Sequence, residues 1–227
     1  MSEAAALYRL MAWLSPAYPV GAFSYSSGLE WGVEAGDVTS TDTLIQWLES
    51  LLCDGLGYCD AVLFAHAHRG CSARNDNELC DVAELAAALA PSRERFLETT
   101  AQGRAFLDVT LAAWPCPTLD RFVGIWSGAI AYPVAVAAAA AGHGIPLAQS
   151  LPAYLQALAA NWVSAGVRLI PLGQTDGQRA TAMLESSVVA TTKRALTATL
   201  DDLGGAAFRA DIAAMRHETQ YTRLFRS

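Results

Sequence analysis

Hydrophobic residues recur along most of this chain at the three- and four-residue spacing of amphipathic helices. The first stripe, Leu7, Leu10, Met11 and Leu14, ends at Pro16. Further stripes, caps and breakers predict helices over residues 28–36, 44–52, 60–68, 76–89, 92–113, 119–127, 129–141, 147–163 and 175–200, then a short helix after 204. We therefore expect one all-α, bundle-like domain of about ten helices over residues 1–227. Its N-terminal helix lies in 1–16, and 204–227 holds the short helix and a tail.

Two pairs of residues have the spacing of a capping box, in which two side chains satisfy backbone N–H groups at a helix start. Ser27 and Glu30 predict the start of a helix that ends at Gly36. Thr175 and Gln178 predict the start of the last long helix. We expect both pairs to serve as helix caps.

The charge of the chain is low and unevenly spread. Charged residues make up 16% of the sequence, below the ~25% typical of soluble domains, and the net charge is -7. Residues 204–227 hold four arginines against two acids, a net of +2, so the first 203 residues carry -9. The acidic total argues against nucleic-acid binding, and the basic tail predicts a different kind of surface.

A run of 46 residues, 122–167, contains no Asp, Glu, Lys or Arg. It is long enough for a membrane helix, which needs about 20 apolar residues. Glycines and prolines interrupt it, its centre is weakly apolar alanine, and no basic cluster flanks it. We expect buried helices or an oligomer interface here rather than a membrane segment.

The single lysine and the five cysteines limit the kinds of ligand binding, catalysis and cross-linking that we expect of this chain. Lys193 is the only lysine and lies outside any P-loop pattern, which excludes lysine-dependent phosphate binding and Schiff-base chemistry. The five cysteines are odd in number and irregularly spaced, and the N-terminus does not resemble a signal peptide. We therefore expect reduced thiols in a cytoplasmic protein.

One stretch holds the right atoms for a metal ion, namely Cys53, Cys59, Asp60, His66, His68 and Cys71. His66 and His68 are two residues apart and would point to different sides of a helix, so the spacing does not fit a local site. We expect no metal site there.

The serines of "GAFSYSSG" raise the alternative of an all-α serine hydrolase that uses Ser24 or Ser26. The stretch lacks the G-x-S-x-G elbow, and no motif supplies a histidine base. Turn-forming serines explain the pattern better.

Three groups of residues could instead contact partner proteins. Phe23 and Tyr25 lie on a neutral loop shaped by prolines and glycines, where aromatics either anchor an interface or seal the core. The tail mixes arginine with aromatic and aliphatic residues at Arg216, Tyr221, Arg223, Leu224 and Phe225. Such a tail tends to fray in water and fold on a partner, so we expect Thr222–Ser227 to be dispensable for the fold.

The third group is the connector around "VRLIPLGQTDGQRA", with Arg168, Gln174 and Gln178. These side chains suit contact with a partner's polar backbone or nucleotide. A capped helix with an exposed arginine accounts for them equally well.

Three stretches together resemble the UreF family of urease accessory proteins. They are "LMAWLSPAYPVGAFSYSSGLEWGVEAG", "VRLIPLGQTDGQRA" and "MRHETQYTRLFRS", and the resemblance runs from end to end of the chain. It implies an all-α, cytosolic protein that is not an enzyme and forms a homodimer in its complex. Such proteins bind UreD (also called UreH), and the pair recruits the GTPase UreG to the urease apoprotein. Nickel is then inserted in a GTP-dependent step, so GTP and nickel act through partners and no cofactor belongs to this chain.

The resemblance also assigns residues. It places Phe23, Tyr25 and the tail residues in the UreD/UreH interface, and Arg168, Gln174 and Gln178 on the GTPase side. Arg168 could be an arginine finger, but positioning or gating fits the sequence better.

Overall fold

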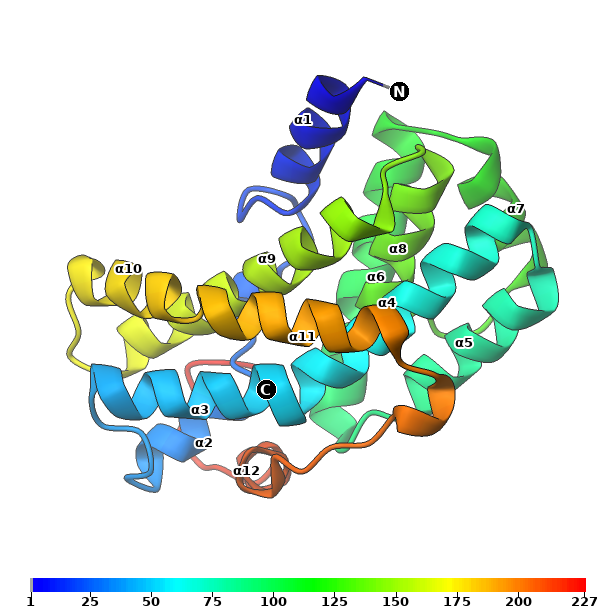
Figure 1. Ribbon diagram of the computed structural model, residues 1–227. Helices are drawn as coiled ribbons and strands as arrows, with labels where there is room; N and C mark the ends of the chain where they lie inside the picture. The colour runs from blue at the N-terminus through cyan, green and yellow to red at the C-terminus, as the bar shows by residue number, and fades with distance from the viewer. Residues whose placement is uncertain (1) are drawn as a thin grey trace.

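The computed structural model describes residues 2–227, which form twelve α-helices and two short 3₁₀ helices without any strand (Figure 1). The all-α fold class is confirmed. The elements in chain order are α1 (Glu3–Trp13), η1 (Ala22–Ser24), α2 (Leu29–Glu34), α3 (Thr41–Asp54), α4 (Leu56–Ala73), α5 (Asp76–Ala88), α6 (Arg93–Ala113), α7 (Pro117–Ile125), α8 (Tyr132–Gly142), α9 (Leu147–Leu169), α10 (Gln174–Met183), α11 (Glu185–Thr197), η2 (Leu200–Asp202) and α12 (Phe208–His217).

The alanine-rich helix α8 lies at the centre of the bundle. It packs chiefly against α4 and α6, and residues 133–140 are all buried. Small side chains allow this close approach. A Cβ added at Gly103 of α6 would fall on the backbone carbonyl of Ile130, so glycine is required at this crossing. The centre of the uncharged run is therefore buried helix, and no helix in residues 2–227 is long and apolar enough to cross a membrane.

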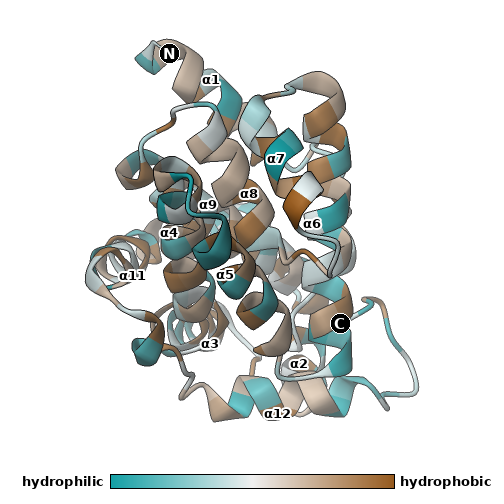
Figure 2. Cartoon of the chain, turned by 90° about the vertical axis from the view of Figure 1, so that its right-hand side faces the viewer, coloured by the Kyte–Doolittle hydropathy of each residue, from teal (hydrophilic) through white to brown (hydrophobic). Residues whose placement is uncertain are grey.

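A second group of helices, α3, α9 and α11, lies side by side across the other half of the molecule, with α10 at one end (Figure 1). Gly166 lets α3 approach α9, because a Cβ at this position would lie 2.6 Å from a methyl group of Leu44. Helix α12 packs against α2 and α6 below this layer, and the C-terminal end of the chain lies beside α6 (Figure 2). The fold therefore brings the C-terminal tail to the loop that follows α1.

Several predicted elements match the structure closely. The first helix and the helix over 76–89 correspond to α1 and α5, and Ser92 caps α6 through the N–H of Arg95 at 3.2 Å. Pro16 lies just beyond α1 in a turn. These segments carry strong local signals, namely a clear apolar stripe, a capping hydroxyl or a breaking proline.

Other boundaries were wrong. The helix predicted over 60–68 begins at Leu56 and ends at Ala73, because Gly55 and Gly57 form a tight corner with α3 rather than breaking the helix. The helix predicted to end at residue 163 continues to Leu169. The last long helix is two helices, α10 and α11, which meet at the buried Leu184 without a glycine or proline to mark the bend.

The predicted capping boxes were also wrong. Gly28, not Ser27, precedes α2, and it makes no side-chain cap bond. Gly173 precedes α10, and its N–H donates to the Asp176 carboxylate at 3.2 Å, so Thr175 and Gln178 do not form the predicted pair.

Candidate partner-docking surface

The loop between α1 and α2 owes its shape to three residues with positive φ. Gly21 and Gly28 have φ of 73° and 83°, and Ser27 adopts a φ of 56°, which is unusual for a residue with a side chain. Gly28 also lies against α12, where an added Cβ would be 2.6 Å from the backbone nitrogen of Ala214. The loop is therefore held tightly against the C-terminal helix.

The C-terminal tail runs alongside this loop and is joined to it by backbone hydrogen bonds. The N–H of Arg226 donates to the carbonyl of Ser24 at 2.8 Å, and the N–H of Ser26 donates to the carbonyl of Ser227 at 2.9 Å. The Ser26 hydroxyl also donates to the Ser227 carbonyl. The tail is therefore not frayed as expected, because these bonds and the burial of Phe225 make it part of the packed molecule.

Ser27 lies at the centre of a buried polar cluster rather than at a helix cap. Its hydroxyl accepts from Arg95 and from the indole N–H of Trp162, both at 2.8 Å, and donates to Glu98 at 3.1 Å. Glu98 also forms an ion pair with Arg95 and accepts from the Ser227 hydroxyl. Because buried polar groups must be paired, this cluster fixes the loop, α6 and the tail relative to one another.

Glu30 anchors the tail. Its carboxylate accepts from the backbone N–H groups of Leu224 at 2.6 Å and Phe225 at 2.9 Å, and it lies 3.0 Å from Nε2 of His217. The other ring nitrogen of His217 lies 2.6 Å from Glu94, which also accepts from Arg223 at 2.6 Å. A glutamate expected to cap its own helix thus binds residues almost 200 positions away.

The residues assigned to the UreD/UreH side fall into two classes. Phe23 and Leu224 expose 67% and 65% of their surface, and Tyr221 is fully exposed. Tyr25 and Phe225 are buried, with 8% and 4% exposed. The exposed group can meet a partner directly, whereas the buried pair holds the loop and tail in place.

Arg168 contacts both of these segments. Its guanidinium donates to the carbonyl of Phe23 at 2.8 Å and lies 4.4 Å from the ring centroid of Phe225. Partial burial lowers its pKa from the usual arginine value. The structure therefore brings Arg168 together with the loop and tail. Gln174 and Gln178, the other connector residues, are exposed in the first two turns of α10.

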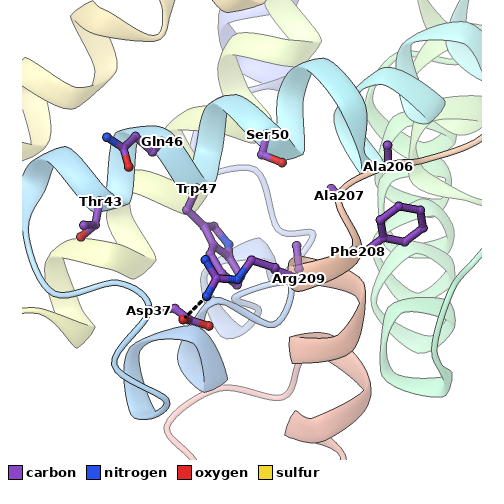
Figure 3. A pocket seen from close by; sticks show the side chains of 10 residues that line it. Asp37, Thr43, Gln46, Trp47, Ser50, Ala206, Ala207, Phe208 and Arg209 are labelled. Atoms are coloured by element: carbon purple, nitrogen blue, oxygen red, sulfur yellow. Dashed lines mark hydrogen bonds and ion pairs between the residues drawn. The ribbon is translucent and has the colours of Figure 1, made fainter.

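The sequence reading missed an apolar face on α12. Phe208, Ile212 and Met215 recur at helical spacing and all are at least half exposed. Beside Phe208 lies a cavity of about 300 Å³ between α3 and the start of α12. Figure 3 shows Trp47 and Arg209 meeting in this cavity, with Arg209 bonded to Asp37 at 2.8 Å. The helical spacing of these apolar residues is visible in the sequence. The sequence does not show that their side chains face the solvent and not the core.

The serine hydrolase alternative finds little support. Ser26 donates its hydroxyl proton to a backbone carbonyl, and neither Ser24 nor Ser26 hydrogen-bonds any histidine within residues 2–227. For the metal, no group of three or more His, Cys, Asp or Glu side chains in the described part of the chain is arranged to hold an ion. His66 and His68 instead bond backbone carbonyls.

Comparison with known proteins agrees with the sequence motifs. The family model UreF matches residues 38–185. The chain is 62% identical over 226 residues to the urease accessory protein UreF of Rhodopseudomonas palustris strain BisB18, which covers 100% of this chain and 94% of that protein. It is 61% identical over 225 residues to the protein of the same name from Bradyrhizobium diazoefficiens, covering 99% of this chain and 93% of that protein. The chain therefore belongs to the UreF family of urease accessory proteins.

Proposed function

We propose that this protein is a non-enzymatic maturation chaperone that bridges a UreD/UreH-type partner and the GTPase UreG on the urease apoprotein. In this proposal the complex forms in the cytoplasm around a homodimer of this chain. Nickel is its cargo, and GTP is bound by the GTPase. The observation that carries the proposal is an exposed apolar surface beside a buried, charged junction between the C-terminal tail and the loop that follows α1.

The UreD/UreH side comprises the exposed residues of the loop, tail and α12. Phe23, Leu224 and Tyr221 all expose large side chains. The backbone of Phe23 is held by Arg168 and that of Leu224 by Glu30. Phe208 and Ile212 add exposed apolar side chains on α12, the helix that precedes the tail. A side chain that is already fixed loses less conformational freedom on binding, so such residues make good anchors.

The GTPase side comprises Gln174 and Gln178, with Arg168 as the link to the loop and tail. Arg168 holds the Phe23 carbonyl and the Phe225 ring, and it is the penultimate residue of α9, six positions before α10 begins. A partner that moves the loop or tail therefore acts on the residue that precedes the connector. We assign Arg168 a positioning role and not that of an arginine finger.

Co-purification with a UreD/UreH-type protein tests the docking surface. We expect the double variant Phe23→Ser, Leu224→Ser to bind this partner at least ~10-fold more weakly, because both are exposed anchors. Val123→Ser, on the exposed side of α7, is the matched control and should bind as the wild type does. Normal binding by the double variant would contradict the assigned interface.

The wider function is tested by activating apo-urease with nickel, GTP, UreG and the UreD/UreH partner, with and without this chain. We expect activation only when the chain is present. The Gln174→Ala, Gln178→Ala variant should keep the UreD/UreH partner and lose UreG. Full activation without the chain would contradict the chaperone proposal.

A further inference from the structure

The chain has four histidines, and one of them differs sharply from the rest. His66, His68 and His143 each place Nε2 beside a backbone carbonyl, those of Ala198, Ile145 and Trp114. Burial lowers the pKa of His68 and of His143, so these two favour the neutral ring. Each needs only one N–H to satisfy its carbonyl.

His217 is fully buried and has a carboxylate oxygen at both ring nitrogens. Glu94 of α6 lies 2.6 Å from Nδ1, and Glu30 of α2 lies 3.0 Å from Nε2. An ionised carboxylate only accepts hydrogen bonds. Both ring nitrogens must therefore donate, which requires the charged imidazolium.

The other partners of the two carboxylates support this proton count. Both oxygens of Glu30 already accept from backbone N–H groups, those of Leu224 and Phe225. Glu94 accepts from the Arg223 guanidinium. When His217 is protonated, the positive charges of His217 and Arg223 balance the negative charges of the two glutamates. With a neutral ring, a lone pair would face a carboxylate and the cluster would carry a buried net negative charge.

The charged groups around His217 come from every element that packs on it. They are Glu30 of α2, Glu94 of α6 and Arg223 of the tail. The Arg95–Glu98 pair lies one step further away and reaches the tail through Ser27 and Ser227. No second cation within hydrogen-bonding distance of Glu30 replaces His217 in residues 2–227.

We propose that His217 is a proton-dependent latch for the C-terminal tail. The protonated ring bridges Glu30 and Glu94, and through them it holds the backbone of Leu224 and Phe225 and the side chain of Arg223 against the loop. Loss of the proton leaves one of the two carboxylates facing a lone pair, and the tail is released. The tail is therefore held at lower pH and freed as pH rises. That this would dismantle the docking surface, to which Leu224 belongs, rests on the proposed function, but the latch itself is a property of this chain alone.

The first test is an NMR titration of the full wild-type chain labelled with ¹⁵N, without any partner. We expect both ring nitrogens of His217 to show N–H chemical shifts in the pH range in which the tail amides are protected, while His68 shows a neutral tautomer. As pH rises, the amide protection of Leu224 and Phe225, corrected for the intrinsic exchange rate, should fall at least ~10-fold with the midpoint of the His217 ring. A His217 ring that stays neutral while both amides remain protected would overturn the proposal.

The second test compares two histidine variants, His217→Gln and His68→Gln, by tryptic cleavage after Arg223 at a series of pH values within the working range of trypsin. In the wild type, cleavage corrected for the pH dependence of trypsin should accelerate at least ~10-fold as the ring loses its proton. His217→Gln should show a flat profile, because glutamine does not titrate, and His68→Gln should keep the wild-type profile. A wild-type profile in folded His217→Gln would refute the latch, whatever the outcome of the partner-binding experiments.

Discussion

The centre of the bundle and the junction between the loop after α1 and the C-terminal tail are built on opposite principles. Around α8, eight consecutive residues are buried and none is charged, so the contacts with α4 and α6 depend on small size and shape. At the junction, Glu30, Arg95, Glu98 and His217 are all at least nine-tenths buried and satisfied by one another. The stability of the centre therefore depends on the size of its side chains, whereas the stability of the junction depends on the charges of its side chains.

The largest expected effect is at the junction. Glu98→Ala removes the carboxylate that pairs with the buried Arg95 and accepts from Ser27 and Ser227. An unpaired buried charge costs several kcal/mol, so the free energy of unfolding should fall by about 4 kcal/mol in urea denaturation. Asp108→Ala on the same helix removes an exposed ion pair with Arg104 and should cost under about 0.5 kcal/mol. Equal losses in the two variants would show that burial of the charge does not matter.

A packing change at the centre should rank second. Gly103→Ala places a methyl group on the carbonyl of Ile130, so α6 and α8 must separate. We expect a loss of about 3 kcal/mol in unfolding free energy. Gly124→Ala in α7 is the matched control, since a Cβ there has open space and alanine favours helix. If Gly103→Ala is as stable as this control, the close approach of the two helices is not required.

Asp60 tests whether a charge is tolerated among the central helices. Burial raises the pKa of this α4 carboxyl to about 6, and Tyr154 donates to it at 2.7 Å. The raised pKa means that its contribution to stability is full below about pH 4 and is lost as pH rises through about 6. Asp60→Asn should remove this pH dependence and raise stability at pH 7 by about 2 kcal/mol. A variant less stable than the wild type at pH 7 would show that the ionised form is favoured there.

The smallest effect on stability is expected at the docking surface itself. Leu224 contributes its backbone N–H to Glu30 and leaves its side chain exposed. Leu224→Ser should therefore change the midpoint of thermal unfolding by less than about 2 °C. Phe225→Ser buries a hydroxyl in place of an aromatic ring and should destabilise the protein clearly. Similar melting temperatures for the two variants would mean that Phe225 is not part of the packed fold.

The sequence predicted the fold class and most helices because their signals are local. The stripe of α1, the Ser92 cap and the proline after α1 each act within a few residues. The bend at Leu184 was missed because it comes from packing and no local breaker marks it. The length of α9 was missed for the same reason, since Gly166 serves a contact with Leu44 rather than a helix end.

The candidate site was predicted only in outline. The aromatic loop and the arginine-rich tail were identified, and the structure adds that they are joined to each other. Ser27 and Glu30 have capping-box spacing, but their partners lie on α6, α9, α12 and the tail. Partners so distant in sequence leave no periodic pattern. The spacing of residues along the chain therefore could not predict which charged side chains are buried together or that they hold the tail.

The bonds between loop and tail also bear on when this surface can form. The Ser26 hydroxyl and the Ser227 carbonyl are separated by 201 positions, almost the full length of the chain. Contacts of such high sequence separation form late in folding, because the chain must first lose the conformational entropy of a long loop. During synthesis the central helices can fold while residues 223–227 are still within the ribosome. A molecule that ends before residue 223 would lack the loop–tail bonds that complete this surface, so partner binding would select folded copies that include residues 223–227.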